Sequence, residues 1–494
     1  MTGNLPKFNK SSPLRVLDIS STTFSRKLPD TFGNLRYLNY LSFHDCYFHG
    51  SLPPSLGNLT EITHMDLSDN GFTRQVPTSL SKLVQLTWLY LAFNYFSGNF
   101  LDVLRNLSKL ETISLFDNIF TGQLPTSIFT LNGLLSLDFS LNQYQGQFPS
   151  QINGLSYLHG IYLSDNLLRG RVPAWLFTLP SLENLDLSQN KLTSPIEQFQ
   201  QPGPLREVDL GDNEFHGPIP DSIFQLLDLT YLALAKNNFS GKVILPQLVR
   251  VILSSSSITE VPFLTSNSSL QVLDLSSNLL RGQLMDLPTQ VYFFSVSNND
   301  LTGEIPPSYC NLSALQSLDL SHNEFCGNIP QCLVNSSITL DFLNLTMNNF
   351  HGSIGSLTFP NQCHVTALML NDNQLEGPLR SSLVNCQDLS ILDVGNNRIN
   401  DSFPNCSFLH GNKKSNVKPS LSSKCKKSKR QFLDNVRKNP QCESHRFPTD
   451  MEPFKPGTQL IHLSSHNSIG ATLGGKTALL YEDSDRNLEI TQSA

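Results

Sequence analysis

The stretch LTWLYLAFNYF at positions 86–96 returns along the chain with the same spacing of apolar residues and asparagine. The next two occurrences are LETISLFDNIF at 110–120 and LLSLDFSLNQY at 134–144. A fixed period of this length, 24 residues in this part of the chain, is typical of proteins built from stacked structural repeats. The asparagine column comprises Asn70, Asn94, Asn118, Asn142, Asn166, Asn190, Asn213, Asn237, Asn278, Asn299, Asn323, Asn348, Asn373 and Asn397.

The shared pattern is L-x-x-L-x-L-x-x-N-x-L/F, in which Leu89 and Leu91 alternate with outward positions as in a short strand. One such strand per unit forms a parallel sheet, whose leucines fill a core that no single unit could close. The asparagine amide can both donate to and accept from the backbone of the buried turn that follows. We therefore predict an α/β solenoid: a leucine-rich-repeat superhelix with a parallel sheet on the concave face and short helical turns on the convex side.

Three units carry another residue in the asparagine position, namely Thr22, Cys46 and Ser256. These side chains satisfy fewer backbone groups than an amide, so we expect weak points there.

The second half of each unit carries an apolar residue before proline, as in FTGQLPTSIFTL at 120–131. A residue before proline avoids the helical conformation, which predicts a second extended segment at that point. Thr126 and Ser127 then stand where a hydroxyl can cap a helical turn.

This second half resembles the plant-specific subclass of leucine-rich repeats. The stretches NLPKFNKSSPLRVLDIS at 4–20 and NDNQLEGPLRSSLVNCQDLSILDVGNNRINDSFP at 371–404 are similar to receptor-like proteins of the disease-resistance type. The resemblance implies a non-enzymatic cell-surface recognition module that binds a peptide, protein or glycan on its concave face. It also implies signalling in plant defence through partner receptor kinases. The alternatives are a secreted inhibitor of cell-wall hydrolases, similar to polygalacturonase inhibitors, or a non-functional gene fragment.

The chain is expected to have three parts. Residues 1–13 are a partial repeat, since TGNLP at 2–6 matches TGEIP at 302–306; residues 14–404 form about 17 units; residues 405–494 are a basic tail, expected to be largely disordered. Compared with the family, this predicts truncation at both ends. The resemblance implies a location at the extracellular face of the plasma membrane. The chain itself shows no signal peptide, and it has no apolar run of about 18 residues that would form a membrane span.

Charge and composition exclude several functions. Residues 1–403 carry 20 basic against 33 acidic side chains, and residues 404–494 carry 14 against 8. An acidic body argues against nucleic-acid binding. No paired CxxC array indicates a metal site, and no cofactor is predicted. The column of aspartates on the predicted strands has no histidine or serine partner that would make it catalytic: Asp18, Asp66, Asp138, Asp186, Asp209, Asp274, Asp319 and Asp393.

GATLGGKT at 470–477 matches the phosphate-binding pattern G-x-x-x-x-G-K-T. That loop requires a buried strand before it and a long helix after it, and only 17 residues follow Thr477. We therefore predict a chance match and no nucleotide.

Large aromatic side chains on the outward positions of the sheet indicate a binding surface, because aromatic anchors are typical of binding hot spots. The alternative is ordinary decoration of the strands. The predicted ligand-binding residues are Tyr40, His64, Trp88, Tyr90, Phe93, Phe116, His159, Tyr162 and Tyr231.

Sequons of the form N-x-S/T suit a glycan-bearing extracellular surface, or merely reflect the repeat consensus. Most lie away from the predicted sheet, whereas Asn344 falls on its concave face. The predicted glycosylation positions are Asn9, Asn58, Asn106, Asn238, Asn267, Asn311, Asn335, Asn344, Asn400 and Asn405.

The chain has 9 cysteines, most of them in its last third. Their connectivity is not encoded in the spacing alone. Cys326 and Cys332, one on each side of an Ile-Pro pair, are the expected local disulfide.

Overall fold

The computed structural model describes residues 7–10, 12–100, 103–243, 248–261, 269–334, 339–361 and 363–399, together with four strands between 463 and 492. The chain divides into two compact units, Met1–Cys425 and Lys426–Ala494.

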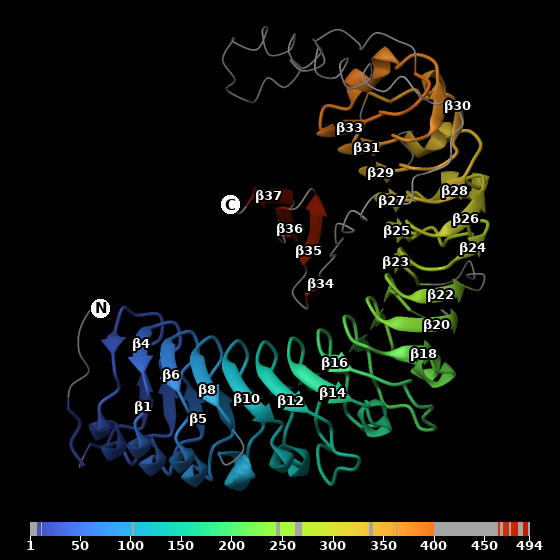
Figure 1. Ribbon diagram of the computed structural model, residues 1–494. Helices are drawn as coiled ribbons and strands as arrows, with labels where there is room; N and C mark the ends of the chain where they lie inside the picture. The colour runs from blue at the N-terminus through green and yellow to red at the C-terminus, as the bar shows by residue number, and fades with distance from the viewer. Residues whose placement is uncertain are drawn as a thin grey trace, which may run out of the picture. The chain divides into compact units, whose positions relative to one another are not determined.

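The first unit is organised around a parallel sheet of 17 strands, which succeed one another in chain order in Figure 1. Each strand pairs in register with the strand of the next unit, as Leu89 does with Met65 on one side and Ile113 on the other. The predicted solenoid fold is confirmed. The strands are β1 Val16–Asp18, β3 Tyr40–Ser42, β5 His64–Asp66, β7 Trp88–Tyr90, β9 Thr112–Ser114, β11 Ser136–Asp138, β13 Gly160–Tyr162, β15 Asn184–Asp186, β17 Glu207–Asp209, β19 Tyr231–Ala233, β21 Arg250–Ile252, β23 Val272–Asp274, β25 Phe293–Ser295, β27 Ser317–Asp319, β29 Phe342–Asn344, β31 Ala367–Met369 and β33 Ile391–Asp393.

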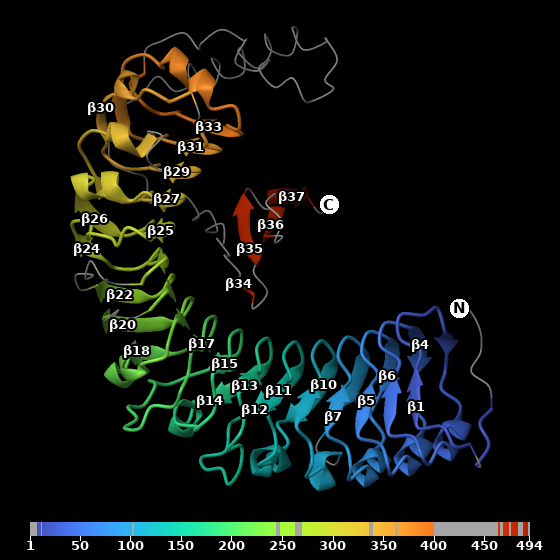
Figure 2. The same cartoon turned by 180° about the vertical axis from the view of Figure 1, so that it is seen from behind.

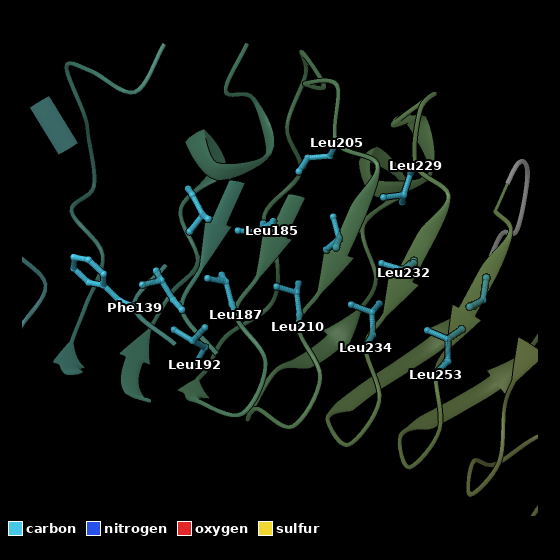
Figure 3. Packing of buried hydrophobic residues seen from close by; sticks show 14 of the residues in the cluster. Phe139, Leu185, Leu187, Leu192, Leu205, Leu210, Leu229, Leu232, Leu234 and Leu253 are labelled. Atoms are coloured by element: carbon cyan, nitrogen blue, oxygen red, sulfur yellow. The ribbon is translucent and has the colours of Figure 1, made fainter. Parts of the chain in front are cut away.

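The core is a set of parallel rows, because every unit contributes the same apolar positions. Leu187, Leu210, Leu234 and Leu253 form one such row in Figure 3, and all four are buried. A second row is aromatic and stacks face to face, with ring centroids 5.9 to 6.3 Å apart: Phe48, Phe72, Phe96, Phe120 and Tyr144. Each unit is thus stabilised by its neighbours rather than by itself.

The asparagines of the column make one repeated set of hydrogen bonds. Nδ2 of Asn142 donates to the carbonyl oxygens of Leu115 at 2.9 Å, Phe139 at 3.2 Å and Ser140 at 3.0 Å, and its Oδ1 accepts from the amide of Phe120 at 3.0 Å. Two of these four bonds reach the preceding unit, so the amide joins neighbouring units as well as closing its own turn. The residue before the asparagine is in the left-handed region, as Leu141 is with φ 54°.

The three substituted positions are bonded less completely. Thr22 Oγ1 donates to the carbonyl of Ile19 at 2.8 Å, and Cys46 Sγ lies 3.2 Å from that same oxygen. Among the described residues, Ser256 Oγ reaches only the carbonyl of Asn237, at 3.5 Å. A single oxygen or sulfur atom cannot span the donors and acceptors that the asparagine amide spans.

A second layer of short parallel strands follows the asparagine turn, visible from the other side in Figure 2. These strands begin one to three residues after the asparagine position, and most of them end near a glycine with positive φ, so they precede the Pro-containing segment where the sequence predicts extension. Gly146, at φ 92°, marks one such end. The strands are β2 Ser25–Arg26, β4 Tyr47–Gly50, β6 Gly71–Arg74, β8 Tyr95–Gly98, β10 Ile119–Gln123, β12 Gln143–Gly146, β14 Leu167–Gly170, β16 Lys191–Leu192, β18 His216–Pro218, β20 Asn238–Lys242, β22 Ser257–Glu260, β24 Arg281–Gly282, β26 Asp300–Gly303, β28 Glu324–Phe325, β30 His351–Ser353 and β32 Gln374–Glu376.

Short 3-10 helices close the units, as the sequence predicts, but their capping differs from the prediction. The residue before η5 is Pro125, whose carbonyl accepts the amide of Ile128 at 3.0 Å, and no side chain caps this turn. Proline already fixes the backbone entering the turn, so no hydroxyl is required. The helices are η1 Asp30–Asn34, η2 Pro54–Asn58, η3 Thr78–Lys82, η4 Leu104–Asn106, η5 Thr126–Thr130, η6 Ala174–Phe177, η7 Asp221–Gln225, η8 Pro307–Asn311, η9 Gln331–Val334, η10 Ile354–Ser356 and η11 Ser381–Asn385.

The predicted disulfide between Cys326 and Cys332 is wrong. Cys332 instead bonds to Cys310, and Cys363 bonds to Cys386. Each bond joins positions 22 or 23 residues apart, because stacking of consecutive units brings equivalent places of the repeat together. Cys326 is a free, partly buried thiol.

The second unit contains a four-stranded antiparallel sheet: β34 Leu463–Ser464, β35 Ser468–Leu473, β36 Lys476–Glu482 and β37 Leu488–Gln492. The sequence predicts a largely disordered tail, so these strands differ from that expectation. Leu473 pairs with Lys476, which leaves only Gly474 and Gly475 between the two strands in the sequence. The pattern GATLGGKT therefore joins two antiparallel strands, whereas a phosphate-binding loop joins a strand to a helix.

Candidate binding surface on the long sheet

The first and third residues of each three-residue strand point away from the core and form two outward rows. Consecutive units place Tyr40, His64 and Trp88 side by side in the first row. Tyr40 stacks on His64 with ring centroids 4.4 Å apart and planes 6° apart. Trp88 meets His64 edge to face at 5.2 Å, and Tyr90 lies tilted at 5.8 Å. Four of the predicted residues therefore form one aromatic cluster, in which the Trp88 side chain is 42% exposed.

The carboxylates of Asp18 and Asp66 influence the pKa values of residues in this aromatic cluster. Burial lowers the pKa of His64, and the negative charges of Asp66 and Asp18 oppose that change. Burial also raises the pKa of Tyr40, with Asp18 and Asp66 adding to it. Hydrogen bonds from Ser20 lower the pKa of Asp18, so this carboxyl stays negative. The aromatic cluster therefore combines an apolar face with negative charge.

Phe93 and Phe116 form a separate pair at the turns that follow β7 and β9, with centroids 5.0 Å apart and planes 65° apart. Phe93 occupies the left-handed position before the asparagine, at φ 51°, and is 50% exposed. A bulky residue in this conformation is uncommon, and its ring is not used by the core. The pair extends the exposed apolar surface beyond the aromatic cluster.

The remaining three predicted residues lie further along the sheet and make no ring contacts with that cluster. His159 is exposed, just before β13. The ring of Tyr162 lies over Gly160, where an added Cβ would meet Tyr162 Cε2 at 2.7 Å. Tyr231 Oη donates to Oδ2 of Asp209 at 3.4 Å. The nine predicted residues thus form one aromatic cluster, one pair and three separate sites.

Two carboxyl groups near these separate tyrosines have pKa values well above the ordinary value of an aspartate. Burial, aided by the charge of Asp186, raises the pKa of Asp209 to about 7. Burial raises that of Asp138 to about 6. In the sequence, both residues are recognisable only as members of the aspartate column. The raised pKa of Asp209 could be anticipated only from the pairing of strands, which makes Asp186 and Asp209 direct neighbours.

The aspartate column has a structural role common to its members. Oδ1 of Asp66 accepts the amide of Ser68 at 3.0 Å, a bond that holds the turn after the strand. The same bond to the residue two positions on is made by Asp18, Asp138, Asp186, Asp209, Asp274, Asp319 and Asp393. Only one carboxylate oxygen is used in this way, which leaves Oδ2 for other interactions.

The predicted glycosylation positions differ in exposure. Asn9, Asn58, Asn106, Asn238 and Asn311 are exposed. Asn344, in contrast, is 6% exposed, and its Oδ1 accepts the amide of Thr346 at 3.1 Å. Because this side chain is buried, we predict that Asn344, unlike the exposed sequons, carries no sugar in the folded chain. Asn267, Asn335, Asn400 and Asn405 lie outside the described residues.

Comparison with known proteins agrees with this architecture. The family model described as Leucine Rich Repeat matches residues 13–35, 37–59, 61–83, 181–201, 204–226, 290–312 and 314–336. In the solved structures, the Arabidopsis receptor kinase HAESA, in complex with the peptide hormone IDA and the co-receptor SERK1, is 29% identical with a TM-score of 0.66. That alignment covers 78% of this chain and 70% of HAESA. The chain therefore has a leucine-rich-repeat fold.

The curated relatives that match are plant receptor-like proteins. Receptor-like protein 54 of Arabidopsis thaliana is 34% identical over 193 residues, which is 37% of this chain and 24% of the relative. Receptor-like protein 35 of the same plant is 35% identical over 182 residues, 36% of this chain and 18% of the relative. The chain is thus similar to plant receptor-like proteins, and it spans about a quarter or less of the length of these two. Within the described ranges, no helix has the length and apolar character needed to cross a membrane.

Proposed function

We propose that the repeats of residues 14–404 are the recognition domain of a plant cell-surface receptor, which binds a peptide or protein ligand on the outward rows of the long sheet. The aromatic cluster of Tyr40, His64, Trp88 and Tyr90 is the observation that carries this proposal. Exposed aromatic side chains held in a rigid sheet provide large contact areas at a small cost in conformational entropy. The peptide hormone named in the HAESA complex supports the ligand class.

The proposal extends to partners and location. A ligand-bound solenoid of this kind acts through receptor kinases at the extracellular face of the plasma membrane, in defence, and does not itself catalyse a reaction. The exposed sequons at Asn58, Asn106 and Asn311 support an extracellular surface, because they lie on the 3-10 helices and away from the outward rows. The co-receptor named in the HAESA complex supports the partner class.

A glycan wedge tests the binding surface. The substitution Asp186→Thr converts Asn184-Leu185-Asp186 on β15 into a glycosylation sequon, which places a sugar on the first outward row. The full chain, fused to a secretion signal, is probed with extracellular domains of leucine-rich-repeat receptor kinases, with and without synthetic secreted peptides. We expect the glycosylated variant to lose at least about tenfold in affinity for any peptide or kinase domain that the wild type binds.

The matched control is Asp186→Ala, which removes the same carboxylate and its turn bond but adds no sugar. It should retain binding within about threefold. Fungal polygalacturonases form a separate arm, scored by inhibition of hydrolysis. Equal binding by the glycosylated variant and the control, or interaction with the hydrolases alone, contradicts the proposed function.

A further inference from the structure

The sequence contains three Asn-Gly dipeptides, at positions 70–71, 132–133 and 153–154. Such a dipeptide can react with itself in water, because glycine has no side chain that keeps its backbone nitrogen away from the preceding asparagine amide. The reaction requires that the asparagine side chain and the following backbone amide are free, and that the backbone between them can turn. The structure gives the three dipeptides different surroundings, which decide where the reaction is possible.

The dipeptide at 70–71 is held by hydrogen bonds. Nδ2 of Asn70 donates to the carbonyl of Phe43 at 2.7 Å, and its Oδ1 accepts the amide of Phe48 at 3.0 Å. Gly71 is the first residue of β6 and is paired in register with β4. The Asn70 side chain would have to break these bonds before it could approach the Gly71 nitrogen, so we expect no reaction there in the folded chain.

The dipeptide at 153–154 is held through its backbone. Asn153 is exposed, but Gly154 lies against the preceding unit, where an added Cβ would meet the carbonyl carbon of Thr130 at 2.6 Å. The next amide, that of Leu155, donates to the carbonyl of Leu131 at 3.2 Å. The backbone after Asn153 therefore cannot turn freely, and we expect a slow reaction.

The dipeptide at 132–133 has neither restraint. Asn132 and Gly133 are both exposed in the turn between η5 and β11. Within the described ranges, neither the Asn132 side chain nor the Gly133 amide makes a hydrogen bond. The corresponding turn one unit earlier is closed by a bond from the amide of Leu110 to the carbonyl of Leu107, at 3.2 Å, whereas among the described residues no such bond closes this one.

We propose that Asn132 is a modification site, at which the folded chain converts asparagine into aspartate and isoaspartate without an enzyme. The nitrogen of Gly133 attacks Cγ of Asn132 and forms a succinimide ring, while the bond from Cγ to Nδ2 breaks. Nδ2 leaves as ammonia and takes the proton of the attacking amide. Water then opens the ring at one of its two carbonyls, which gives aspartate or isoaspartate, and no oxidant or reductant is involved. This inference does not depend on the proposed function.

The isoaspartate product alters the link that enters β11. Leu131 and Leu134, on either side of the dipeptide, are both buried in the core. Isoaspartate routes the main chain through its Cβ and so adds one atom to a link whose two ends are fixed. We therefore expect the converted chain to be less stable than the chain that keeps Asn132.

Peptide mapping of the aged protein measures the conversion. The secreted full chain is incubated at about pH 7.5 and about 37 °C for several weeks, and mass spectrometry with electron-based fragmentation distinguishes aspartate from isoaspartate. We expect Asn132 to convert at least about tenfold faster than Asn70, with Asn153 in between. In urea concentrated enough to unfold the chain, the three positions should convert at rates within about threefold of one another.

Gly133→Ala is the matched variant. An added Cβ at this position would meet only the carbonyl oxygen of Leu110, at 3.8 Å, so the variant has room to fold as the wild type does. It should slow conversion of Asn132 about tenfold and leave Asn70 and Asn153 unchanged. The urea midpoint of the wild type should fall on ageing, whereas that of Gly133→Ala should be retained.

Three results overturn the inference. The first is conversion of Asn70 in the folded chain as fast as that of Asn132. The second is an unchanged rate at Asn132 in Gly133→Ala. The third is the same order of rates in the unfolded chain as in the folded one, because local sequence rather than the fold would then select Asn132. An aged wild type that converts and yet keeps its urea midpoint contradicts the effect on the link into β11.

Discussion

The hydroxyl of Tyr231 donates a hydrogen bond to Oδ2 of Asp209 across 3.4 Å, while Oδ1 of the same carboxyl accepts the amide of Gly211 at 2.9 Å. Both carboxyl oxygens of Asp209 thus accept hydrogen bonds from residues of the long sheet or its following turn. Asp186, the neighbour of Asp209 in the second outward row, brings a second negative charge close to it. Burial and this neighbour together make the charged form of Asp209 unfavourable, and the consequence is a dependence of stability on pH.

Stability should fall as the pH rises from about 4 to about 7. The pKa of Asp209 is raised to about 7 in the folded chain, from an ordinary value of 3.8, so the folded state holds a proton that the unfolded state has released. Asp209→Asn keeps the acceptor for Gly211 and removes the titration. We expect the wild type to lose about 2 kcal/mol of unfolding free energy between pH 5 and pH 7.5, and the variant to lose clearly less.

Urea denaturation at the two pH values measures this difference. Asp393→Asn, on an exposed aspartate with the same turn bond, serves as the control and should follow the wild type. If the Asp209→Asn variant loses as much unfolding free energy between the two pH values as the wild type, then groups other than Asp209 cause the pH dependence of stability.

Removing the hydroxyl of Tyr144 should stabilise the chain. This ring is fully buried between Phe120 and Phe139, and its hydroxyl has no partner within the described residues. Tyr144→Phe eliminates a buried polar group without opening a cavity, so we expect the unfolding free energy to rise by about 1 kcal/mol. Tyr309→Phe is the matched control, because its hydroxyl donates to the carbonyl of Met285 at 3.0 Å. That variant should lose about 1 kcal/mol, and two changes of the same sign would refute the assignment.

Substitutions in the asparagine column should have opposite effects on stability: removing an asparagine should destabilise the chain, and introducing one at a position that lacks it should stabilise the chain. Asn142→Ala leaves the amide of Phe120 and several buried carbonyls unpaired, with an expected cost of about 3 kcal/mol. Cys46→Asn introduces the missing amide and should stabilise the chain by about 1 kcal/mol. Urea titrations of both variants, with Gln143→Ala at an exposed neighbouring position as control, test this. A cost for Asn142→Ala no larger than that of the control would argue against a structural role for the column.

Peptide mapping without reduction should recover two cross-linked peptides, one joining Cys310 to Cys332 and the other joining Cys363 to Cys386. Cys326 should be alkylated before reduction, since it is not bonded in the folded chain. Cys326→Ser should leave both cross-links intact. A peptide joining Cys326 to Cys332 would restore the pairing that the sequence predicts and contradict the observed one.

Glycopeptide analysis of secreted protein should find sugars at exposed sequons and none at Asn344. Asn58 and Asn311 end 3-10 helices on the solvent side, where a sugar meets no neighbouring strand. Asn344 lies within β29, between the adjacent strands β27 and β31. The measurement is the occupied fraction at each position. Substantial occupancy at Asn344 would contradict the burial of its side chain in the folded chain.

The long sheet could be predicted from sequence because its signal repeats in every unit. Leu89 and Leu91 identify a strand only weakly, but the same spacing over many units leaves one fold that buries all of them together. The convex side was predicted less well. Thr126 and Ser127 suggested a capped helical turn, whereas Pro125 already sets the entry to η5 and no side chain caps it. Local motifs of this kind have several structural solutions, and packing between units selects among them.

The candidate surface divides in the same way. The repeat period alone places Tyr40, His64 and Trp88 on neighbouring strands, since residues 24 positions apart are paired in register. That period also aligns Asp18 and Asp66 around Ser42. Which rings stack, which thiols bond and which carboxyls hold a proton depend instead on distances of a few ångströms between side chains. Those distances are set by how each unit rests on the next, and therefore only the tertiary structure decided them.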